Sequence, residues 1–296
     1  MNVIEVDRLF KTFKSKYIKV AALNGMSFSV KQGEIYGFLG PNGAGKSTTI
    51  KIIMDLIRAD TGEVRIMGLP STDYKARINI GFMPENPQYY DNITGLDLLM
   101  LSAFMFKLKR DIAYKKALNL LETFGLIDSA KKQLRKYSKG MIQKIGFASA
   151  IIHDPKILIL DEPMSGLDPI GRVLFKNIMN ELNKNGTTIF FSSHIIPDIE
   201  EICSKVIIVK SGQVVNELDR LQIKHLTTSG FQIIFKKRNI LIPNYKIDAL
   251  NDDLMQVEVN KNDFFYVMEI LKNSSVEIID IVSIKHSLED IFIDMV

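Results

Sequence analysis

Short apolar runs alternate with amphipathic stretches over the first 218 residues. The runs at 35–39 and 157–160 are continuous, and each precedes a polar segment. Continuous runs of this length are typical of strands buried on both faces of a parallel sheet. Further strands are predicted at 187–192 and 206–210, and helices at 47–57, 95–125, 138–153 and around Leu174, Ile178 and Leu182. Strands that alternate with helices predict an α/β fold with a mostly parallel sheet.

The pattern changes near residue 219. Apolar residues then alternate with polar ones around Ile233 and around Val257, as in strands with one exposed face. Residues 262–272 and 287–295 are predicted to be helical and 276–281 extended. We therefore expect a main domain over 1–218 and a small α/β accessory domain over 219–296.

Composition and charge limit the possible functions. The chain has 296 residues, of which 46% are hydrophobic and 24% charged, with a net charge of +4. Residues 1–218 hold 29 basic and 22 acidic side chains, whereas residues 219–296 hold 9 and 12. The surplus of basic over acidic side chains in residues 1–218 suits a polyanionic ligand such as a nucleotide, but it is too small to indicate DNA or RNA. We expect no nucleic-acid partner.

Neither a disulfide framework nor a membrane span is expected. Cys203 is the only cysteine, and charged residues such as Asp7 and Arg8 interrupt any N-terminal signal segment. The longest uncharged apolar run, near 98–106, is about half the length that a membrane-spanning helix needs.

The strongest chemical signal is a glycine-rich loop between a predicted strand and a predicted helix. Its residues are Gly40, Pro41, Asn42, Gly43, Ala44, Gly45, Lys46, Ser47 and Thr48, which match GxxxxGK[ST]. Such a loop points backbone N–H groups at phosphate oxygens, and the helix N-terminus adds partial positive charge. Lys46 is expected to reach the β- and γ-phosphates and Ser47 to ligate Mg²⁺. The alternative, a glycine-rich turn that happens to contain a lysine, does not account for the flanking elements.

Polar residues also follow two other predicted strands. Asp161 and Glu162 come directly after 157–160, and His194 follows 187–192. Asp161 could hold Mg²⁺ through water, Glu162 could act as the general base, and His194 could contact the γ-phosphate. The alternatives are a pair of solvated acids and a structural histidine, the role we assign to His153, His225 and His286.

In this order the motifs resemble the ATP-binding-cassette (ABC) ATPase family. The resemblance rests on the glycine-rich loop and on Tyr137-Ser138-Lys139-Gly140-Met141, Leu160-Asp161-Glu162-Pro163, Ser165-Gly166-Leu167-Asp168 and His194. It covers residues 1 to about 218. It implies a P-loop NTPase fold: a RecA-like core with a mostly parallel sheet, an antiparallel β part and a helical subdomain at about 88–153. The accessory domain at 219–296 lies outside this resemblance.

The same resemblance assigns further site residues. Phe13 matches the aromatic residue that stacks on adenine, with Tyr17 as a second candidate, and Glu85 matches the loop residue beside Mg²⁺. Ser138 and Gly140 match the signature residues that meet the γ-phosphate held by another copy. Asp168 matches the aspartate that links two sites across a dimer, and His194 matches the switch histidine.

Two departures from the family pattern stand out. Lys139 and Met141 replace Gly and Gln in the signature, and Glu85 replaces the usual Gln. A carboxylate at position 85 can still ligate Mg²⁺ but cannot donate a hydrogen bond when ionised. Both departures, and the segment 287–292, are similar to bacterial exporter ATPases of the drug-resistance, bacteriocin-immunity and sodium-export kind.

The resemblance implies an ATP-binding and hydrolysing subunit that energises a separate membrane-spanning permease, as part of an exporter. It would work with ATP and Mg²⁺, peripherally at the cytoplasmic face of the cell membrane. Its partner in an ATP-sandwich dimer would be a second, head-to-tail copy or a paralogous ATPase. No residue here encodes the transported substrate.

Two other functions of a chain with a glycine-rich phosphate loop fit this sequence less well. A soluble ABC ATPase acting on ribosomes or DNA generally needs two cassettes or a long insertion, whereas here about 90 residues separate Thr48 from the signature. A small-molecule kinase would leave 137–141 and Asp168 unexplained.

Tyr89 and Tyr90 lie in a predicted loop that follows Glu85. Aromatic residues are enriched at protein interfaces, so the pair could receive a short helix of the permease. The alternative is that the two rings cover the core of this chain.

Overall fold

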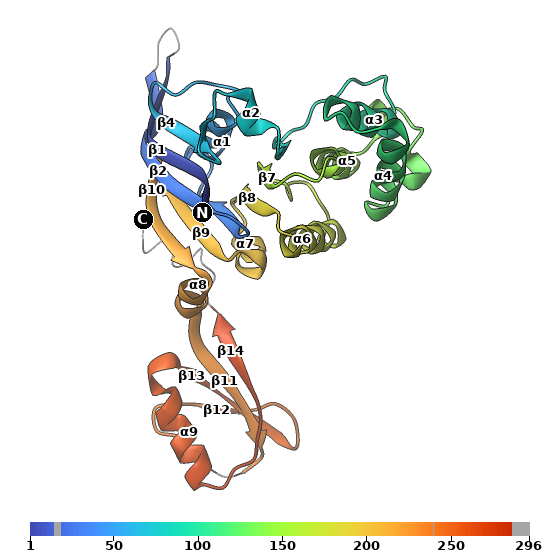
Figure 1. Ribbon diagram of the computed structural model, residues 1–296. Helices are drawn as coiled ribbons and strands as arrows, with labels where there is room; N and C mark the ends of the chain where they lie inside the picture. Colours follow the sequence, from blue (N-terminus) through green and yellow to red (C-terminus); the bar gives the residue numbers. More distant parts are fainter. Residues whose placement is uncertain (15–18, 239, 286–296) are drawn as a thin grey trace. The chain divides into compact units, whose positions relative to one another are not determined.

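The computed structural model describes residues 1–14, 19–238 and 240–285 (Figure 1). The chain divides into two compact units, Met1–Arg220 and Leu221–Val296. The division lies two residues beyond the boundary expected from the sequence.

A six-stranded sheet forms the centre of the first unit. Its strand order is β10-β9-β3-β8-β7-β6, and only the β9–β10 pair is antiparallel. The strands are β3 (Ile35–Leu39), β6 (Ile80–Met83), β7 (Ile157–Leu160), β8 (Thr188–Ser193), β9 (Lys205–Lys210) and β10 (Gln213–Asp219). Every residue of β3 and β7 is buried, which confirms the prediction from their continuous apolar runs.

A second, antiparallel sheet has the order β2-β1-β4-β5. Its strands are β1 (Asn2–Lys14), β2 (Lys19–Lys31), β4 (Thr61–Ile66) and β5 (Leu69–Pro70). The hydrophobic pattern does not reveal β1 and β2, because several register shifts interrupt their pairing and blur the period-two alternation. Buried residues of both sheets share one core, in which Phe28, Phe38 and Phe190 pack ring against ring.

Helices surround the central sheet and extend to one side of it in Figure 1. They are α1 (Lys46–Ile53), α2 (Tyr74–Arg77), α3 (Gly95–Met105), α4 (Arg110–Thr123), α5 (Lys139–Ile151), α6 (Pro169–Lys184) and α7 (Ile196–Ile202). Helix α1 ends four residues before the predicted limit, just ahead of Asp55 with a positive φ of 56°. The helix predicted over 95–125 is two helices, because Lys107 adopts a φ of 59° that a right-handed helix cannot contain.

The second unit has its own sheet and core. The strand order is β12-β13-β11-β14, all antiparallel. The elements are α8 (Arg220–Thr227), β11 (Thr228–Lys236), β12 (Ile247–Ala249), β13 (Leu254–Asn260), α9 (Phe264–Asn273) and β14 (Ile278–Lys285). Ile233, Phe235, Val257, Val259 and Val267 are buried together, so alternate residues of β11 and β13 face α9. The helix predicted at 287–295 lies outside the described residues.

Within the described ranges no helix combines the length and apolar character needed to cross a membrane.

An aromatic cluster joins α4, α5 and α6. Phe147 packs edge-on against Phe175 at 4.7 Å and lies 5.6 Å from Phe124, and all three are fully buried. We predict that Phe147→Ala lowers the unfolding free energy of the first unit by about 3–5 kcal/mol, through lost burial and the cavity left behind. Urea unfolding followed by circular dichroism measures this change. The control Tyr74→Ala, at a side chain that is mostly exposed, should change it by less than about 0.5 kcal/mol. Equal effects of the two substitutions would contradict the role of the cluster.

Candidate functional site

The glycine-rich loop connects β3 to the N-terminus of α1. Gly43 and Gly45 have φ angles of 85° and 101°, which a residue with a side chain rarely adopts. A side-chain carbon at Gly45 would lie 2.7 Å from the Ala22 carbonyl oxygen, so β2 leaves space only for glycine. The loop therefore curls tightly before α1, and its N–H groups and the helix terminus form an anion-binding end.

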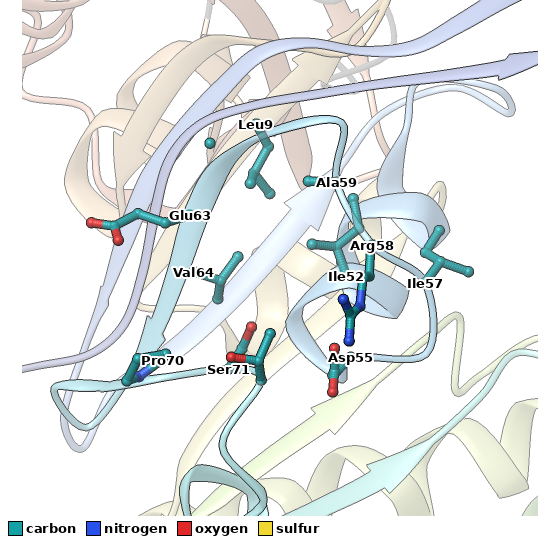
Figure 2. A pocket seen from close by; sticks show the side chains of 12 residues that line it. Leu9, Ile52, Asp55, Ile57, Arg58, Ala59, Glu63, Val64, Pro70 and Ser71 are labelled. Atoms are coloured by element: carbon teal, nitrogen blue, oxygen red, sulfur yellow. The ribbon is translucent and has the colours of Figure 1, made fainter.

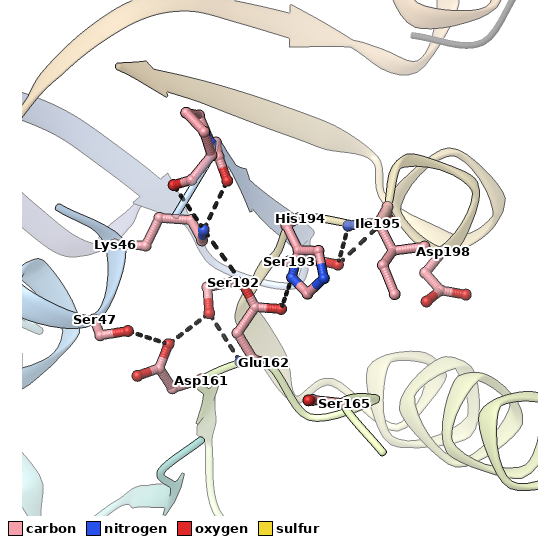
Figure 3. Close-up of polar contacts among 12 residues, drawn as sticks. Lys46, Ser47, Asp161, Glu162, Ser165, Ser192, Ser193, His194, Ile195 and Asp198 are labelled. Carbon is pink, nitrogen blue, oxygen red and sulfur yellow. Dashed lines mark hydrogen bonds and ion pairs between the residues drawn. The ribbon is translucent and has the colours of Figure 1, made fainter. Parts of the chain in front are cut away.

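Lys46 is buried inside this loop, with 6% of its surface exposed. Its ammonium donates to the carbonyl oxygens of Gly40 at 2.7 Å and Pro41 at 3.3 Å. It also lies 3.3 Å from Oε1 of Glu162, in an ion pair between two buried side chains (Figure 3). The cation is thus surrounded by oxygen atoms from two segments that lie more than 100 residues apart.

Asp161 and Ser47 meet at the carboxyl end of β7. The Ser47 hydroxyl donates to Oδ1 of Asp161 at 3.1 Å, and the Ser192 hydroxyl donates to the same oxygen at 2.6 Å. Ser192 also accepts a hydrogen bond from the backbone N–H of Glu162 at 2.9 Å. Burial raises the pKa of Asp161, although the two hydroxyls and Lys51 oppose the shift. Sequence reasoning missed this role of Ser192, whose only signal was its position at the end of a strand beside His194.

Glu162 and His194 form a second pair. Nδ1 of His194 lies 2.8 Å from Oε2 of Glu162 (Figure 3). Glu162 has a φ of 48°, a left-handed conformation that is strained for a residue with a long side chain. The strained turn directs its carboxylate between the Lys46 ammonium and the His194 ring.

A pocket of about 640 Å³ opens over these groups. It brings together segments of β1, the loop after β6, the glycine-rich loop and the ends of β7 and β8. The predicted site residues that line it are Phe13, Asn42, Gly43, Gly45, Lys46, Ser47, Thr48, Glu85, Glu162 and His194. Phe13 is 44% exposed, and the Lys11 ammonium lies 5.7 Å from the centre of its ring. Tyr17 lies outside the described residues. Val20, Ala21, Ala22 and Ser165 also line the pocket but were not predicted.

The remaining predicted residues, Asp161 among them, do not line the pocket. Ser138 and Asp168 are exposed N-caps of α5 and α6; their side chains accept from the backbone N–H groups of Met141 at 3.3 Å and Gly171 at 2.8 Å. Neither they nor Gly140 line the pocket. Ala44 is buried within the glycine-rich loop, and Gly40 and Pro41 contribute the carbonyls that hold Lys46.

A smaller hollow of about 220 Å³ lies between α1 and the antiparallel sheet (Figure 2). Leu9, Ile52, Val64 and Asp55 are among its lining residues. None of the predicted site residues lines it, so it does not compete as the nucleotide pocket.

Comparison with known proteins places this geometry in a family. Residues 23–165 match the family described as ABC transporter. The chain is 36% identical over 298 residues to the uncharacterized ABC transporter ATP-binding protein YdbJ of Bacillus subtilis, covering 98% of this chain and 94% of YdbJ. The chain belongs to the ABC transporter family.

Two further comparisons refine its place in the family. The bacitracin transport ATP-binding protein BcrA of Bacillus licheniformis is 31% identical over 305 residues, covering 100% of this ABC subunit and 97% of BcrA. The dimeric post-hydrolysis structure of the ATP-binding cassette MJ0796 with ADP and Pi has a TM-score of 0.68 at 25% identity, covering 73% of this subunit and 98% of that chain. The fold class and the resemblance to drug-resistance exporters are confirmed. The chain is therefore an ATP-binding subunit of a transporter rather than a soluble ATPase of ribosomes or DNA.

We predict that Asp161→Asn stabilises the nucleotide-free ABC subunit. The raised pKa means that the folded state disfavours the Asp161 charge, so this group lowers stability as pH rises through and beyond the ordinary aspartate range. The neutral amide should raise the unfolding midpoint at pH 7.5 by roughly 2–4 °C for each kcal/mol gained. Scanning calorimetry without nucleotide measures the shift, and the same scan at pH 4 should show a smaller difference. A lower midpoint for the variant at pH 7.5 would contradict the prediction.

Proposed function

We propose that this chain binds MgATP in the 640 Å³ pocket, hydrolyses it, and thereby drives a separate membrane-spanning permease in an exporter. The observation that carries the proposal is the convergence of Phe13, the glycine-rich loop, Glu162 and His194 on that one pocket. An aromatic face, an anion-binding loop and a carboxylate are the parts that a nucleotide and its hydrolysis need.

ATP would lie with adenine on Phe13 and its phosphates in the loop from Gly40 to Thr48. Lys46 already has oxygen neighbours on several sides, so phosphate oxygens can replace Glu162 and the carbonyls without moving the ammonium far. Glu162, released from Lys46, would then take the proton from the attacking water while His194 holds its other oxygen.

The residues around Ser47 suit Mg²⁺. Its hydroxyl and the Asp161 carboxylate lie 3.1 Å apart, and both are hard oxygen ligands of the kind that Mg²⁺ prefers beside phosphates. Glu85 lines the same pocket and can add a further carboxylate oxygen, directly or through water. Mg²⁺ bound with the nucleotide would neutralise charge that develops on the transferred phosphoryl group.

A second subunit, identical or paralogous, would complete the site head-to-tail. Ser138, Gly140 and Asp168 are part of the expected ATP machinery, yet none of them lines the pocket of its own chain. Ser138 caps the N-terminus of a 13-residue helix that has no acidic residue in its first turn, so this terminus suits a phosphate on a facing subunit.

Export rests on the similarity of the signature at 137–141, of Glu85 and of the segment 287–292 to exporter ATPases. Peripheral attachment at the cytoplasmic face follows from the permease partnership, and we assign no nucleic-acid partner. The name of BcrA, bacitracin transport, supports membership of a transport system. The unit from residue 221 carries none of the nucleotide motifs, and we propose that it is an accessory domain.

We predict different defects for two substitutions in the pocket. Lys46→Ala should abolish ATP binding, because it removes the charge that neutralises the β- and γ-phosphates. Glu162→Gln should retain binding but lose turnover by about 10²–10⁴-fold, the range for losing a general base. Equilibrium binding of a fluorescent ATP analogue and a phosphate-release assay measure the two effects.

Light scattering of Glu162→Gln with MgATP should also show a dimer. Equal loss of binding in both variants, or a monomer at high concentration, would overturn the proposed roles.

The two adjacent tyrosines differ in their surroundings, and each fits one of the two expected roles: covering the core of this chain or contacting the permease. The Tyr89 hydroxyl lies 3.0 Å from where a side-chain carbon at Gly146 would stand, so its ring covers α5. Burial raises the pKa of Tyr89 to about 12. Tyr90 is 80% exposed. We therefore assign contact with the permease to Tyr90 and a structural role to Tyr89.

We predict that Tyr90→Ala leaves basal ATP hydrolysis unchanged but reduces recovery of the permease in a tagged pull-down from detergent-solubilised membranes. Tyr89→Ala should instead lower the unfolding midpoint, because it opens space beside Gly146. If Tyr90→Ala recovers as much permease as the wild type, the docking surface lies elsewhere.

A further inference from the structure

Gln143 connects two neighbouring loops of the ATP pocket, which follow the adjacent parallel strands β6 and β7. It lies on α5, and its side chain is buried, with 1% exposed. Its Nε2 donates to the carbonyl oxygen of Glu85 at 2.9 Å and approaches that of Ser165 at 3.4 Å. Both Glu85 and Ser165 line the pocket, although Gln143 does not. One buried carboxamide thus joins the loop after β6 to the turn after β7.

The surroundings of Gln143 determine the orientation of its amide. Both neighbours are carbonyl oxygens, which can only accept, so the NH₂ group must face them. The opposite atom, Oε1, is buried without a hydrogen-bond partner among the residues that the structure describes. Leaving a buried acceptor unmet is unfavourable. The two bonds to the loops are therefore the interactions that explain a glutamine at this position.

Helix α5 also has contacts beyond these loops. Ser138 caps its N-terminus, and the Ser149 hydroxyl lies 2.8 Å from that of Ser102 on α3. A displacement of α3 and α5 would consequently reach the two loops through Gln143. The Ser165 turn leads directly to the catalytic carboxylate, because its N–H donates to the Glu162 carbonyl at 3.1 Å.

We propose that Gln143 is a positioning residue that holds the Glu85 loop and the Ser165 turn together against α5, so that this side of the ATP pocket follows the helix. The inference rests on the proposed function and deepens it by naming how the helical segment controls the site. The glycine-rich loop makes no contact with Gln143 in the hydrogen bonds of the described residues. Gln143 therefore influences the positions of Glu162 and Glu85, whereas phosphate binding by the glycine-rich loop does not depend on it.

The test compares Gln143→Met with Ser149→Ala in the full chain. Methionine keeps the length and volume of the side chain but removes both donors. Ser149→Ala removes a polar contact from the same helix without touching either loop, so it serves as the matched control. Gln143→Leu is a second variant in case the first folds poorly, because it also lacks the donors and adds no buried charge.

Two readouts separate positioning from general stability. For Gln143→Met we expect kcat for MgATP to fall about 10–100-fold, the scale for small misplacements of catalytic groups, with the Kd for ATP within about twofold of wild type. Hydrogen exchange should accelerate in residues 84–90 and 163–168 and remain unchanged in β1 and β3. Ser149→Ala should retain wild-type kcat and exchange in those loops.

Wild-type kcat in both Gln143 variants would overturn the inference, as would faster exchange spread over the whole first unit. An equal loss of kcat in Ser149→Ala would overturn it as well. If the wild-type protein itself fails to hydrolyse MgATP, the proposed function is wrong. Exchange needs no turnover, so the loop-specific result would then decide on Gln143 by itself.

Discussion

Three charged side chains, Lys46, Asp161 and Glu162, lie almost out of water at the carboxyl edge of the central sheet. Burying a charge is costly unless a partner of opposite sign or a hydrogen bond replaces the lost hydration. Here Lys46 compensates Glu162, while two hydroxyl groups compensate Asp161 only in part, so that its pKa stays raised. The need to compensate these buried charges explains much of the remaining structure. Strand β7 has to lie beside β8 so that Ser192 reaches Asp161, and the loop before α1 has to be tight so that backbone carbonyls face Lys46. The same arrangement makes the site receptive to a nucleotide, because phosphate oxygens can substitute for groups that already surround the cation.

The walls of the pocket come from parts of the chain that are held by different forces. Phe13 stands on the antiparallel sheet, whose apolar core is shared with the central sheet. Glu85 and Ser165 lie in loops between strands, and their shared bond to Gln143 connects them to α5. The glycine-rich loop is thus attached to β3 and packs on β2, whereas the side that carries Glu85 is attached to the helices. In the proposed function, a pocket built this way would keep its hold on phosphate while the side that carries Glu85 changes position.

The unit from residue 221 has a separate core between its sheet and α9. Its acidic balance differs from the basic balance of the nucleotide-binding unit. Since it lacks the motifs that bind nucleotide, its contribution to transport would act through contacts rather than through chemistry. The relatives YdbJ and BcrA match nearly the whole chain, so a segment of this kind accompanies the nucleotide-binding unit in them as well.

The sequence by itself determined those features that depend on neighbouring residues. A strand followed by GxxxxGK[ST] specifies a phosphate loop, because glycine conformations and the helix N-terminus act within a dozen residues. Apolar runs likewise predicted β3 and β7, which are buried on both faces. Tertiary structure alone decided the features that join distant segments. It placed Ser192 on Asp161 and Gln143 between Glu85 and Ser165, and it separated the half-buried Tyr89 from the exposed Tyr90. It also divided the helix predicted at 95–125, because Lys107 adopts a left-handed conformation that the sequence pattern did not predict. Such contacts depend on which strands and helices become neighbours, and that choice belongs to the packing of the whole unit.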